Sequence, residues 1–288
     1  MFFAMFTKLL LYLFFTINCA LFLPGNYEFN FDENKKYSFL RDLDNPLAQL
    51  KTSFLKNIPY QSLLQGILEG IHPYEVILCD MDSSSPYVLI MTTVKYVYIL
   101  GCPHADQLQT ILKTLSGYKQ LKIICDESVQ TYFIQQGFLI QPRIEFEMSD
   151  FDITTHYDLP HGFRLKPLDE LLLKQSSWYS FVALSYGGLE RFLEHSFGFA
   201  LVDDKGKSVA QAYAVYTSQE QCEIGIVTEA AHQGKGYIVY PLKALLTKCI
   251  NQGIKPVWNC NTENIASWKT ALKFGFKIKR HYAYVQGI

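Results

Sequence analysis

The sequence predicts an α/β protein with two domains. Segments rich in β-branched and aromatic residues alternate along the chain with segments whose apolar residues recur at helical spacing. The chain has 288 residues, which is long for one core and ordinary for two. Hydrophobic residues make up 49% of it and charged residues 18%, so a large core can form.

The first residues form an apolar segment. Residues 2–23 are apolar apart from Lys8 and Asn18, and residues 9–17 have the character of a signal-peptide h-region. The whole segment is near the roughly 20 residues that span a bilayer, but a good cleavage site is missing. A signal peptide, a membrane anchor, a misread start and a buried apolar arm therefore all stay open. Residues 24–45 are polar and are expected to be a linker.

The first expected domain covers residues 46–158. Apolar residues at helical spacing between Pro46 and Glu69 predict two short helices. Strand and helix patterns then alternate. The expected strands cover residues 75–79, 87–93, 96–100, 121–125 and 138–148, and the expected helices cover residues 108–115 and 129–136.

The second expected domain covers residues 159–288. A turn at residues 203–206 joins two of its strands as a hairpin. The expected strands cover residues 163–167, 198–203, 208–217, 221–228, 255–260 and 276–285, and the expected helices cover residues 168–176, 188–195, 237–251 and 264–273.

The two halves share one pattern. Both KIICDESVQTYFIQQGFLIQPRIEF and KPVWNCNTENIASWKTALKFGFKIKRHYAYV give a strand, a polar turn, a helix, Gly-Phe and a strand. The first half has no glycine-rich turn between Leu100 and Leu108, so a duplicated first half would support or shape the acceptor pocket instead of binding a cofactor. The same pattern is common in unrelated α/β domains, and both interpretations stay open.

Charge and cysteine usage narrow the classes of function. The chain has 26 Lys and Arg against 27 Asp and Glu, which leaves no electrostatic footprint for nucleic acid. Its seven cysteines are widely spaced and include no C-x-x-C pair. We therefore expect no nucleic-acid partner, no metal and no disulfide framework.

A glycine-bearing turn precedes the helix expected at 237–251. Gln233, Gly234, Lys235, Gly236 and Tyr237 present successive backbone N–H groups between a strand and a helix start. The first N–H groups of a helix lack partners and lie at the positive end of its dipole, so a pyrophosphate can bind there. A turn of this kind alone is also common on ordinary protein surfaces.

The wider context resembles the GNAT acyltransferase superfamily. The residues that carry the resemblance are EIGIVTEAAHQGKGY, from residue 223, and WNCNTENIAS, from residue 258, followed by Gly275-Phe276. The resemblance covers about residues 162–284 and implies a GNAT fold, with a mixed central sheet and flanking helices. If the internal repeat is real, a degenerate GNAT-like N-terminal domain precedes it. The resemblance also implies acetyl-CoA as cosubstrate, with no metal.

Two residues depart from the superfamily pattern. Ile238 stands where the turn usually has Gly or Ala, and Ala271 stands where many relatives have a tyrosine acid. The first change puts pyrophosphate binding in doubt, and the second excludes a tyrosine general acid at that position.

The resemblance also implies roles for individual residues. Two parallel strands splay apart to admit pantetheine, and the backbone of Ile226, Val227 and Thr228 pairs with its amides. Asn264 is expected to hydrogen-bond the cofactor arm. Glu223 is the candidate general base, because attack on a thioester requires a deprotonated amine. An exposed, non-catalytic carboxylate is the alternative.

Two further residue groups have a functional and a structural interpretation. A basic cluster from Lys269 to Arg280 either meets the 3′-phosphate of coenzyme A or forms a solvated surface. In the aromatic segment from Trp178, most rings are expected in the core, and Tyr186 is expected to line a pocket.

The sequence therefore predicts an acyl-CoA-dependent N-acyltransferase that transfers acetyl groups to a primary amine of a small molecule or peptide. The alternative is a catalytically silent acyl-CoA-binding or interaction protein of the same fold. A cytoplasmic catalytic domain is expected, with membrane contact only if residues 2–23 are kept as an anchor.

Overall fold

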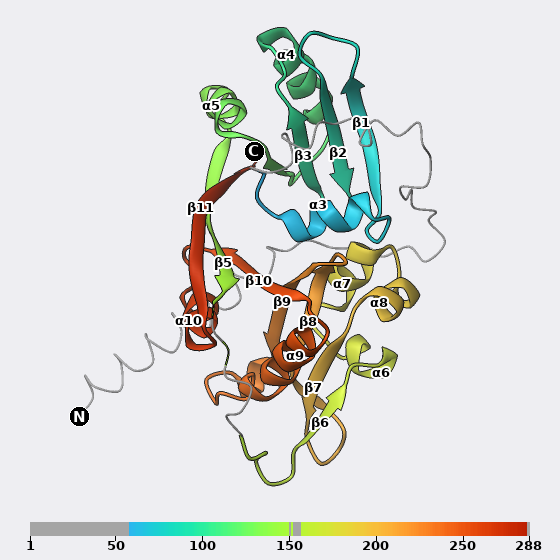
Figure 1. Ribbon diagram of the computed structural model, residues 1–288, viewed down its shortest axis with the longest axis vertical. Coiled ribbons are helices and arrows are strands. Elements are labelled where there is room, and N and C mark those ends of the chain that lie inside the picture. Colours follow the sequence, from blue (N-terminus) through green and yellow to red (C-terminus); the bar gives the residue numbers. More distant parts are fainter. Residues whose placement is uncertain (1–57, 150, 152–156, 287–288) are drawn as a thin grey trace, which may run out of the picture. The chain divides into compact units, whose positions relative to one another are not determined.

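One mixed sheet runs through the protein. The computed structural model describes residues 58–149, 151 and 157–286 (Figure 1). All of them lie within one compact unit. The described strands form an 11-stranded sheet in the order β1-β2-β3-β4-β11-β5-β10-β9-β8-β7-β6. The strands are β1 (Tyr74–Asp80), β2 (Tyr87–Thr92), β3 (Tyr96–Gly101), β4 (Lys122–Ile124), β5 (Leu139–Met148), β6 (Arg164–Pro167), β7 (Gly198–Val202), β8 (Ser208–Thr217), β9 (Gln221–Thr228), β10 (Lys255–Asn261) and β11 (Phe276–Gln286).

Helices flank this sheet. They are α3 (Gln61–Leu68), α4 (Ala105–Leu115), α5 (Glu127–Gln135), α6 (Glu170–Lys174), α7 (Tyr179–Tyr186), α8 (Leu189–His195), α9 (Val239–Asn251) and α10 (Ile265–Lys273), with a 3₁₀ turn η2 (Ala230–His232). The expected α/β class and mixed sheet are confirmed. Helix α4 begins three residues before the expected start, because Gln107 Oε1 accepts the His104 backbone N–H at 2.7 Å and satisfies one of the free donors of the first turn.

The last strand of each half of the chain pairs with the other half. Strand β5 pairs antiparallel with β10, with Phe146 opposite Trp258. Strand β11 pairs with β5 and then with β4, where Val285 lies opposite Ile123. Figure 1 shows β5 and β11 side by side between the two parts of the sheet. The pairings mirror each other around these two strands. The internal repeat and the domain boundary at residue 158 both remain predictions.

Two helix layers account for most of the core. Helices α9 and α10 cover one face of the second half, where Leu245, Trp258 and Phe276 are buried together. Helices α4 and α5 cover the sheet of the first half, where Ile111 and Phe133 are fully buried. Both layers come from the spacing of apolar residues in the sequence, which gives each helix one apolar side.

The opposite face of β8 and β9 meets α3 and α7. The Tyr216 ring lies 5.9 Å from the Tyr60 ring and 6.3 Å from the Phe181 ring, measured between centroids. Ala212 and Ala214 of the same strand lie in the core under α9 instead. The register shift between Ala214 and Tyr216 interrupts the alternation of β8 and turns Tyr216 to the other face, so β8 separates the α9 core from a second layer rich in tyrosine.

His72 ties α3 to this second layer. Its Nδ1 donates to the Ser185 backbone oxygen at 2.8 Å, and its Nε2 accepts the Thr217 backbone N–H at 3.0 Å. Burial lowers the pKa of His72 to about 4, so the ring is neutral at pH 7 and has a lone pair for the second contact. Gly66 lies directly against this joint: a Cβ built on it would be 2.2 Å from the Thr217 oxygen and 2.4 Å from the His72 ring.

The N-terminal segment 2–23, the linker 24–45 and the start of the folded part near Pro46 lie outside the described residues. In the part of the chain that the structure describes, no helix has both the length and the apolar character needed to cross a membrane.

Replacing Gly66 with Ala should destabilise the protein by about 3 kcal/mol or more, because the new methyl group meets backbone that cannot move without breaking the His72 joint. Urea unfolding would measure the change. Gly117→Ala is the matched control, because the nearest atom to a Cβ there is 4.0 Å away. Equal losses of stability in the two variants would contradict the predicted contact.

Candidate active site

Strands β9 and β10 pair for only part of their length. Their parallel ladder covers Gln221, Cys222 and Glu223 of β9, opposite residues 255–257 of β10. Beyond Glu223, β9 continues to Thr228 with β8 as its partner, while β10 continues to Asn261 with β5 as its partner. The two strands therefore diverge, and the expected splayed pair is confirmed. Ile226, Val227 and Thr228 lie on the diverging part of β9.

The turn after β9 carries free backbone donors. Within the described part of the chain, the N–H groups of residues 234–238 donate to no protein acceptor. Gly234 and Gly236 have φ values of 74° and 75°, a conformation that glycine adopts easily. Lys235 Nζ donates to the Ala231 oxygen at 3.1 Å and Gln233 Nε2 to the Thr228 oxygen at 3.2 Å, so both side chains brace the turn. The turn lies between η2 and α9, and Tyr237 follows it with its ring 4.9 Å from that of Phe163.

Ile238 packs away from the free donors. Its side chain is partly buried against Leu201, Val209 and Ala210 of β7 and β8. A β-branched residue is therefore accommodated at this position by the core, and the turn keeps its backbone donors. This arrangement removes the physical objection to phosphate binding that the sequence raised.

Asn264 starts helix α10. Its side chain accepts the Ser267 backbone N–H at 3.1 Å, and Ser267 Oγ in turn accepts the Trp258 indole N–H at 3.0 Å. The carboxamide oxygen of Asn264 thus serves as a helix cap. Ala271 is fully buried in the core beneath the same helix and carries no acidic group.

Glu223 is buried at the point where the strands diverge. Its side chain is 4% exposed, and Oε2 accepts a hydrogen bond from Asn259 Nδ2 at 3.1 Å. Burial raises its pKa to about 8, although Arg143, Tyr60 and Asn259 all act in the opposite direction. Glu223 is therefore not the exposed carboxylate that the sequence left open, and its catalytic role stays a prediction.

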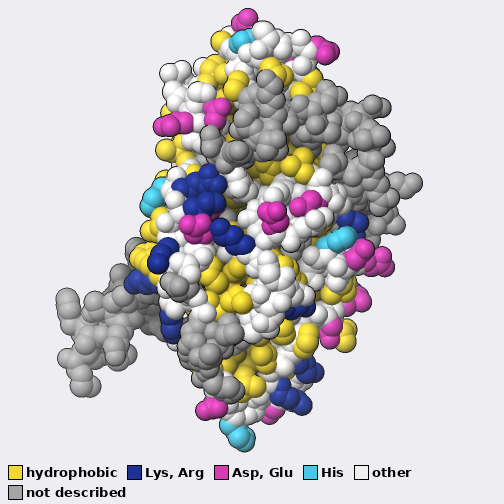
Figure 2. All heavy atoms as spheres, viewed as in Figure 1, with side chains coloured by type: hydrophobic (Ala, Val, Ile, Leu, Met, Phe, Trp, Pro, Cys, Tyr) yellow, Lys and Arg dark blue, Asp and Glu magenta, His cyan; other side chains and the backbone are white. Residues whose placement is uncertain are grey.

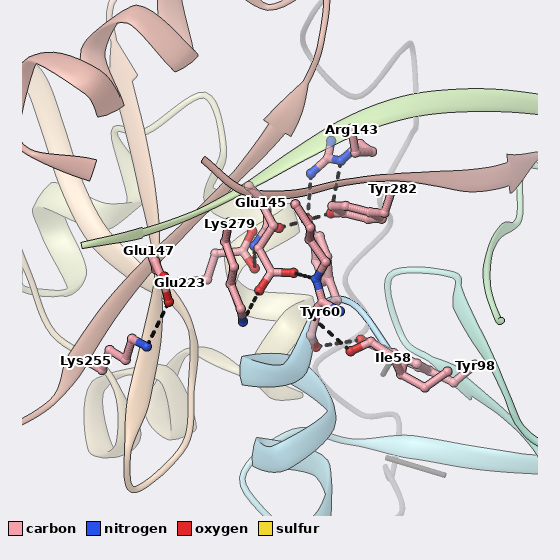
Figure 3. Close-up of polar contacts among 12 residues, drawn as sticks. Ile58, Tyr60, Tyr98, Arg143, Glu145, Glu147, Glu223, Lys255, Lys279 and Tyr282 are labelled. Carbon is pink, nitrogen blue, oxygen red and sulfur yellow. Dashed lines mark hydrogen bonds and ion pairs between the residues drawn. The ribbon is translucent and has the colours of Figure 1, made fainter. Parts of the chain in front are cut away.

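Several residues around Glu223 were not identified from the sequence. Arg143 of β5 and Tyr282 of β11 lie opposite each other in the sheet, and Tyr60 precedes α3 (Figure 3). Asn259 belongs to the WNCN motif, where Trp258 and Cys260 face the core. The strict alternation of this motif was a usable signal for Asn259, whereas Tyr60 and Arg143 are distant in sequence and no pattern linked them to Glu223.

Two sequence interpretations are corrected by the structure. Tyr186 does not line a pocket: it is fully buried, and its hydroxyl donates to the Ala214 backbone oxygen at 3.1 Å. The basic cluster is divided, because Lys279 and Arg280 form ion pairs with the buried Glu145, with Lys279 Nζ 2.7 Å from Oε1. A register shift between Ile278 and Arg280 interrupts the alternation of β11 at Lys279, so both neighbouring side chains reach Glu145.

The face of the molecule drawn in Figure 2 carries charges of both signs. Figure 2 shows Lys and Arg side chains interspersed with Asp and Glu side chains on the face drawn. Among the described residues, no group of three or more His, Cys, Asp or Glu side chains is placed to hold a metal ion.

Comparison with known proteins identifies the class. Residues 52–285 match the family model described as GNAT acetyltransferase, so the chain belongs to the GNAT acetyltransferase family. It is 26% identical over 126 residues to the uncharacterized N-acetyltransferase YdfB of Bacillus subtilis (strain 168), an alignment that covers 43% of this chain and 48% of that relative. The match thus spans about half the length of the curated relative.

Solved structures share the fold. A GCN5-related N-acetyltransferase-like protein from Streptococcus suis 89/1591 superposes with a TM-score of 0.63 at 20% identity, covering 81% of this chain and 95% of that one. A GNAT-family acetyltransferase from Novosphingobium aromaticivorans gives a TM-score of 0.53 at 13% identity, with coverages of 84% and 97%. At these identities the likeness establishes the fold alone. The family membership supports acyl-CoA-dependent N-acyltransferase activity in general.

Burial of Glu223 makes protein stability depend on pH. Its carboxyl has its ordinary pKa of 4.5 in the unfolded chain, whereas burial raises the pKa to about 8 in the folded one. The folded state is therefore penalised progressively as pH rises from 4.5 to 8. Glu223→Gln should remove this penalty and stabilise the protein at pH 9 by a few kcal/mol, at roughly 1.4 kcal/mol per unit of pKa difference, with little effect at pH 4.5.

Urea unfolding at both pH values would measure the difference. Glu263→Gln, at an exposed residue just before α10, controls for the loss of one carboxyl group. If both variants change stability by the same amount at pH 9, Glu223 does not carry the buried charge.

Proposed function

We propose that this protein transfers an acetyl group from acetyl-CoA to a primary amine of a small molecule or peptide, with Glu223 as general base. The observation that carries the proposal is the position of Glu223. It is a buried carboxyl at the last paired position of β9 and β10, where the strands diverge. Family membership supplies the general reaction, and this residue supplies the proton acceptor that the reaction needs.

The residues present fit coenzyme A. The free N–H groups between Gln233 and Tyr237 suit the pyrophosphate, and the positions where Gly234 and Gly236 would carry a Cβ have nothing within 4 Å. Among the described strands, none pairs with the edge of Ile226, Val227 and Thr228 that faces away from β8, and this edge suits the pantetheine amides. Asn264 uses its oxygen as a helix cap and keeps its amide N–H groups for the cofactor arm.

The chemistry assigned to Glu223 is one proton transfer. An ammonium acceptor gives its proton to the carboxylate, directly or through a water, and its nitrogen can then attack the thioester carbonyl carbon. The carbon–sulfur bond breaks, the nitrogen loses its second proton to the departing sulfur, directly or through a water, and coenzyme A leaves as the thiol. A base with a pKa near 8 is matched to this task, because it is partly ionised near neutral pH and still strong enough to accept a proton from an amine.

A catalytically silent acyl-CoA-binding protein is the second candidate. The observation that favours it is Ala271, which leaves the usual acid position without a hydroxyl group. Such a protein would bind acetyl-CoA but release no free coenzyme A with any acceptor in an amine panel. Turnover with one amine would exclude it.

The glycine at position 236 tests the cofactor site. Gly236→Val should weaken coenzyme A binding by roughly 1–3 kcal/mol, because valine disfavours a φ of 75° and its side chain projects near the free donors. Isothermal titration calorimetry with coenzyme A would measure this. Gly206→Val is the matched control, because Gly206 has a φ of 81° and open space around its Cβ position but lies in the β7–β8 hairpin. Unchanged affinity in a folded Gly236→Val protein would contradict the site.

The role of Glu223 is tested by kinetics. Glu223→Gln should lower kcat by roughly 10²- to 10⁴-fold and leave coenzyme A affinity nearly intact, because the amide keeps the shape but accepts no proton. In the wild type, kcat/KM should rise with pH up to about 8, where Glu223 becomes ionised, and the variant should lack this rise. Turnover within a few-fold of wild type would show that another group, or bulk water, takes the proton.

A further inference from the structure

A chain of hydrogen bonds runs from Arg143 to Glu223. Arg143 Nε donates to the Tyr282 hydroxyl oxygen at 3.4 Å, and Tyr282 donates to Asn259 Oδ1 at 3.1 Å. Asn259 Nδ2 then donates to Glu223 Oε2 at 3.1 Å. A guanidinium can only donate, so the direction of every bond in the chain is fixed, and all of them point protons toward the carboxylate.

A second arm runs through Tyr60. Arg143 Nη2 donates to the Tyr60 hydroxyl at 3.0 Å, and Arg143 Nη1 donates to Asn261 Oδ1. Because its oxygen accepts from Arg143, the Tyr60 hydroxyl keeps its own proton for another acceptor; Glu223 interacts with this hydroxyl, and the Tyr96 hydroxyl lies 3.5 Å from it. Both asparagines of the WNCN motif are thus occupied by this network.

Tyr60 is held in an unfavourable backbone conformation. Its φ of 65° and ψ of 40° are left-handed, which an aromatic residue seldom adopts. The Tyr98 hydroxyl donates to its backbone oxygen at 3.1 Å, and the Arg143 guanidinium lies 5.6 Å from its ring centroid. Strain of this kind persists where surrounding contacts enforce it and is typical of functional sites.

Arg143 is the cation that acts on Glu223. Among the described residues, no carboxylate forms an ion pair with Arg143. Glu145 is buried and adds negative charge, but Lys279 and Arg280 are paired with it. Arg143 instead contacts hydroxyl and amide oxygens and the ring of Tyr284, 4.7 Å away. The ionisable groups that act on Glu223 or respond to it are Tyr60, Tyr96, Tyr98, Arg143, Glu145, Tyr216, Cys222, Cys260 and Tyr282.

We propose that Arg143 and Tyr60, both contributed by the first half of the chain, are positioning residues that orient the partners of Glu223 and hold it as an ionised base. The proposal rests on the proposed function for its catalytic meaning. It gives the first half a direct part in the reaction. The second half supplies the base and the cofactor turn, and the first half supplies the positive charge that favours the ionised form of the base.

Infrared titration of the protein without ligands tests this arrangement. The stretch of the protonated Glu223 carboxyl is isolated by subtracting the spectrum of Glu223→Gln, and it is followed from pH 5 to 10. Arg143→Met should move the midpoint upward by about one pH unit or more, because an opposite charge nearby favours the ionised form. Tyr60→Phe should move it in the same direction, and Arg143→Lys should move it less than Arg143→Met.

Lys255→Met is the matched control. Lys255 lies on the same strand as Asn259, and its Nζ pairs with Glu147 Oε2 at 3.3 Å (Figure 3). The Lys255→Met substitution removes one positive charge from the same sheet and changes none of the hydrogen bonds between Arg143 and Glu223. The proposal is overturned if the midpoint is unchanged in folded Arg143→Met and Tyr60→Phe proteins, or if Lys255→Met shifts it equally. Should Arg143→Met fail to fold, Tyr60→Phe, which keeps the ring, decides the matter.

Kinetics separate this inference from the proposed function. The acid limb of kcat/KM should move upward in Tyr60→Phe by the same number of pH units as the infrared midpoint. A shifted midpoint in a protein that acetylates no amine would support the network and contradict the proposed function. A shifted midpoint with an unmoved acid limb would overturn the assignment of Arg143 and Tyr60 to catalysis.

Discussion

The placement of β5 between β10 and β11 is the constraint on which the rest of the structure depends. Strand β5 lies between β10 and β11, which follow each other in the chain. It pairs with the edge of β10 that faces away from β9. With that edge paired, β10 can part from β9 after only three paired positions without leaving both of its edges unpaired. The divergence of β9 and β10, to which we assign the cofactor, is therefore supported from the other half of the chain.

The same strand decides the electrostatics of the site. A carboxyl group that loses its water is driven toward the neutral form, and burial is the largest effect on Glu223. Arg143 and Glu145 both belong to β5, one lowering and the other raising the pKa of Glu223. Because Glu145 is paired with Lys279 and Arg280 of β11, the balance near Glu223 depends on the register between β5 and β11. A slip of one residue would exchange the faces on which these charges lie.

In the turn before α9, the proposed cofactor site consists of backbone groups. Its free N–H groups and two glycines are the features that suit a phosphate, and its side chains brace the turn or pack into the core. This explains why Ile238 can replace a smaller residue. What matters at that position is the backbone conformation, and the side chain has its own apolar site on β7 and β8.

The sequence by itself determined the family, the divergent strand pair and most of the helices and strands, although helix α7 was not located from it. Alternation and helical spacing act locally, so β8, β9, α9 and β10 could be located from residue patterns, and the EIGIVTEAAHQGKGY and WNCNTENIAS motifs indicated the GNAT family. It also singled out Glu223, although it could not decide between a buried base and an exposed carboxylate.

Only the tertiary structure decided what surrounds that carboxylate. Arg143 lies 80 residues before Glu223 by number, and it reaches the network because β5 crosses into the other half of the sheet. Tyr60 lies near Glu223 because α3 packs against β8 and β9. Tyr186 is buried in the same tyrosine-rich layer and does not line the candidate site. Such contacts depend on strand order and register between distant segments, which no local pattern in a single sequence encodes.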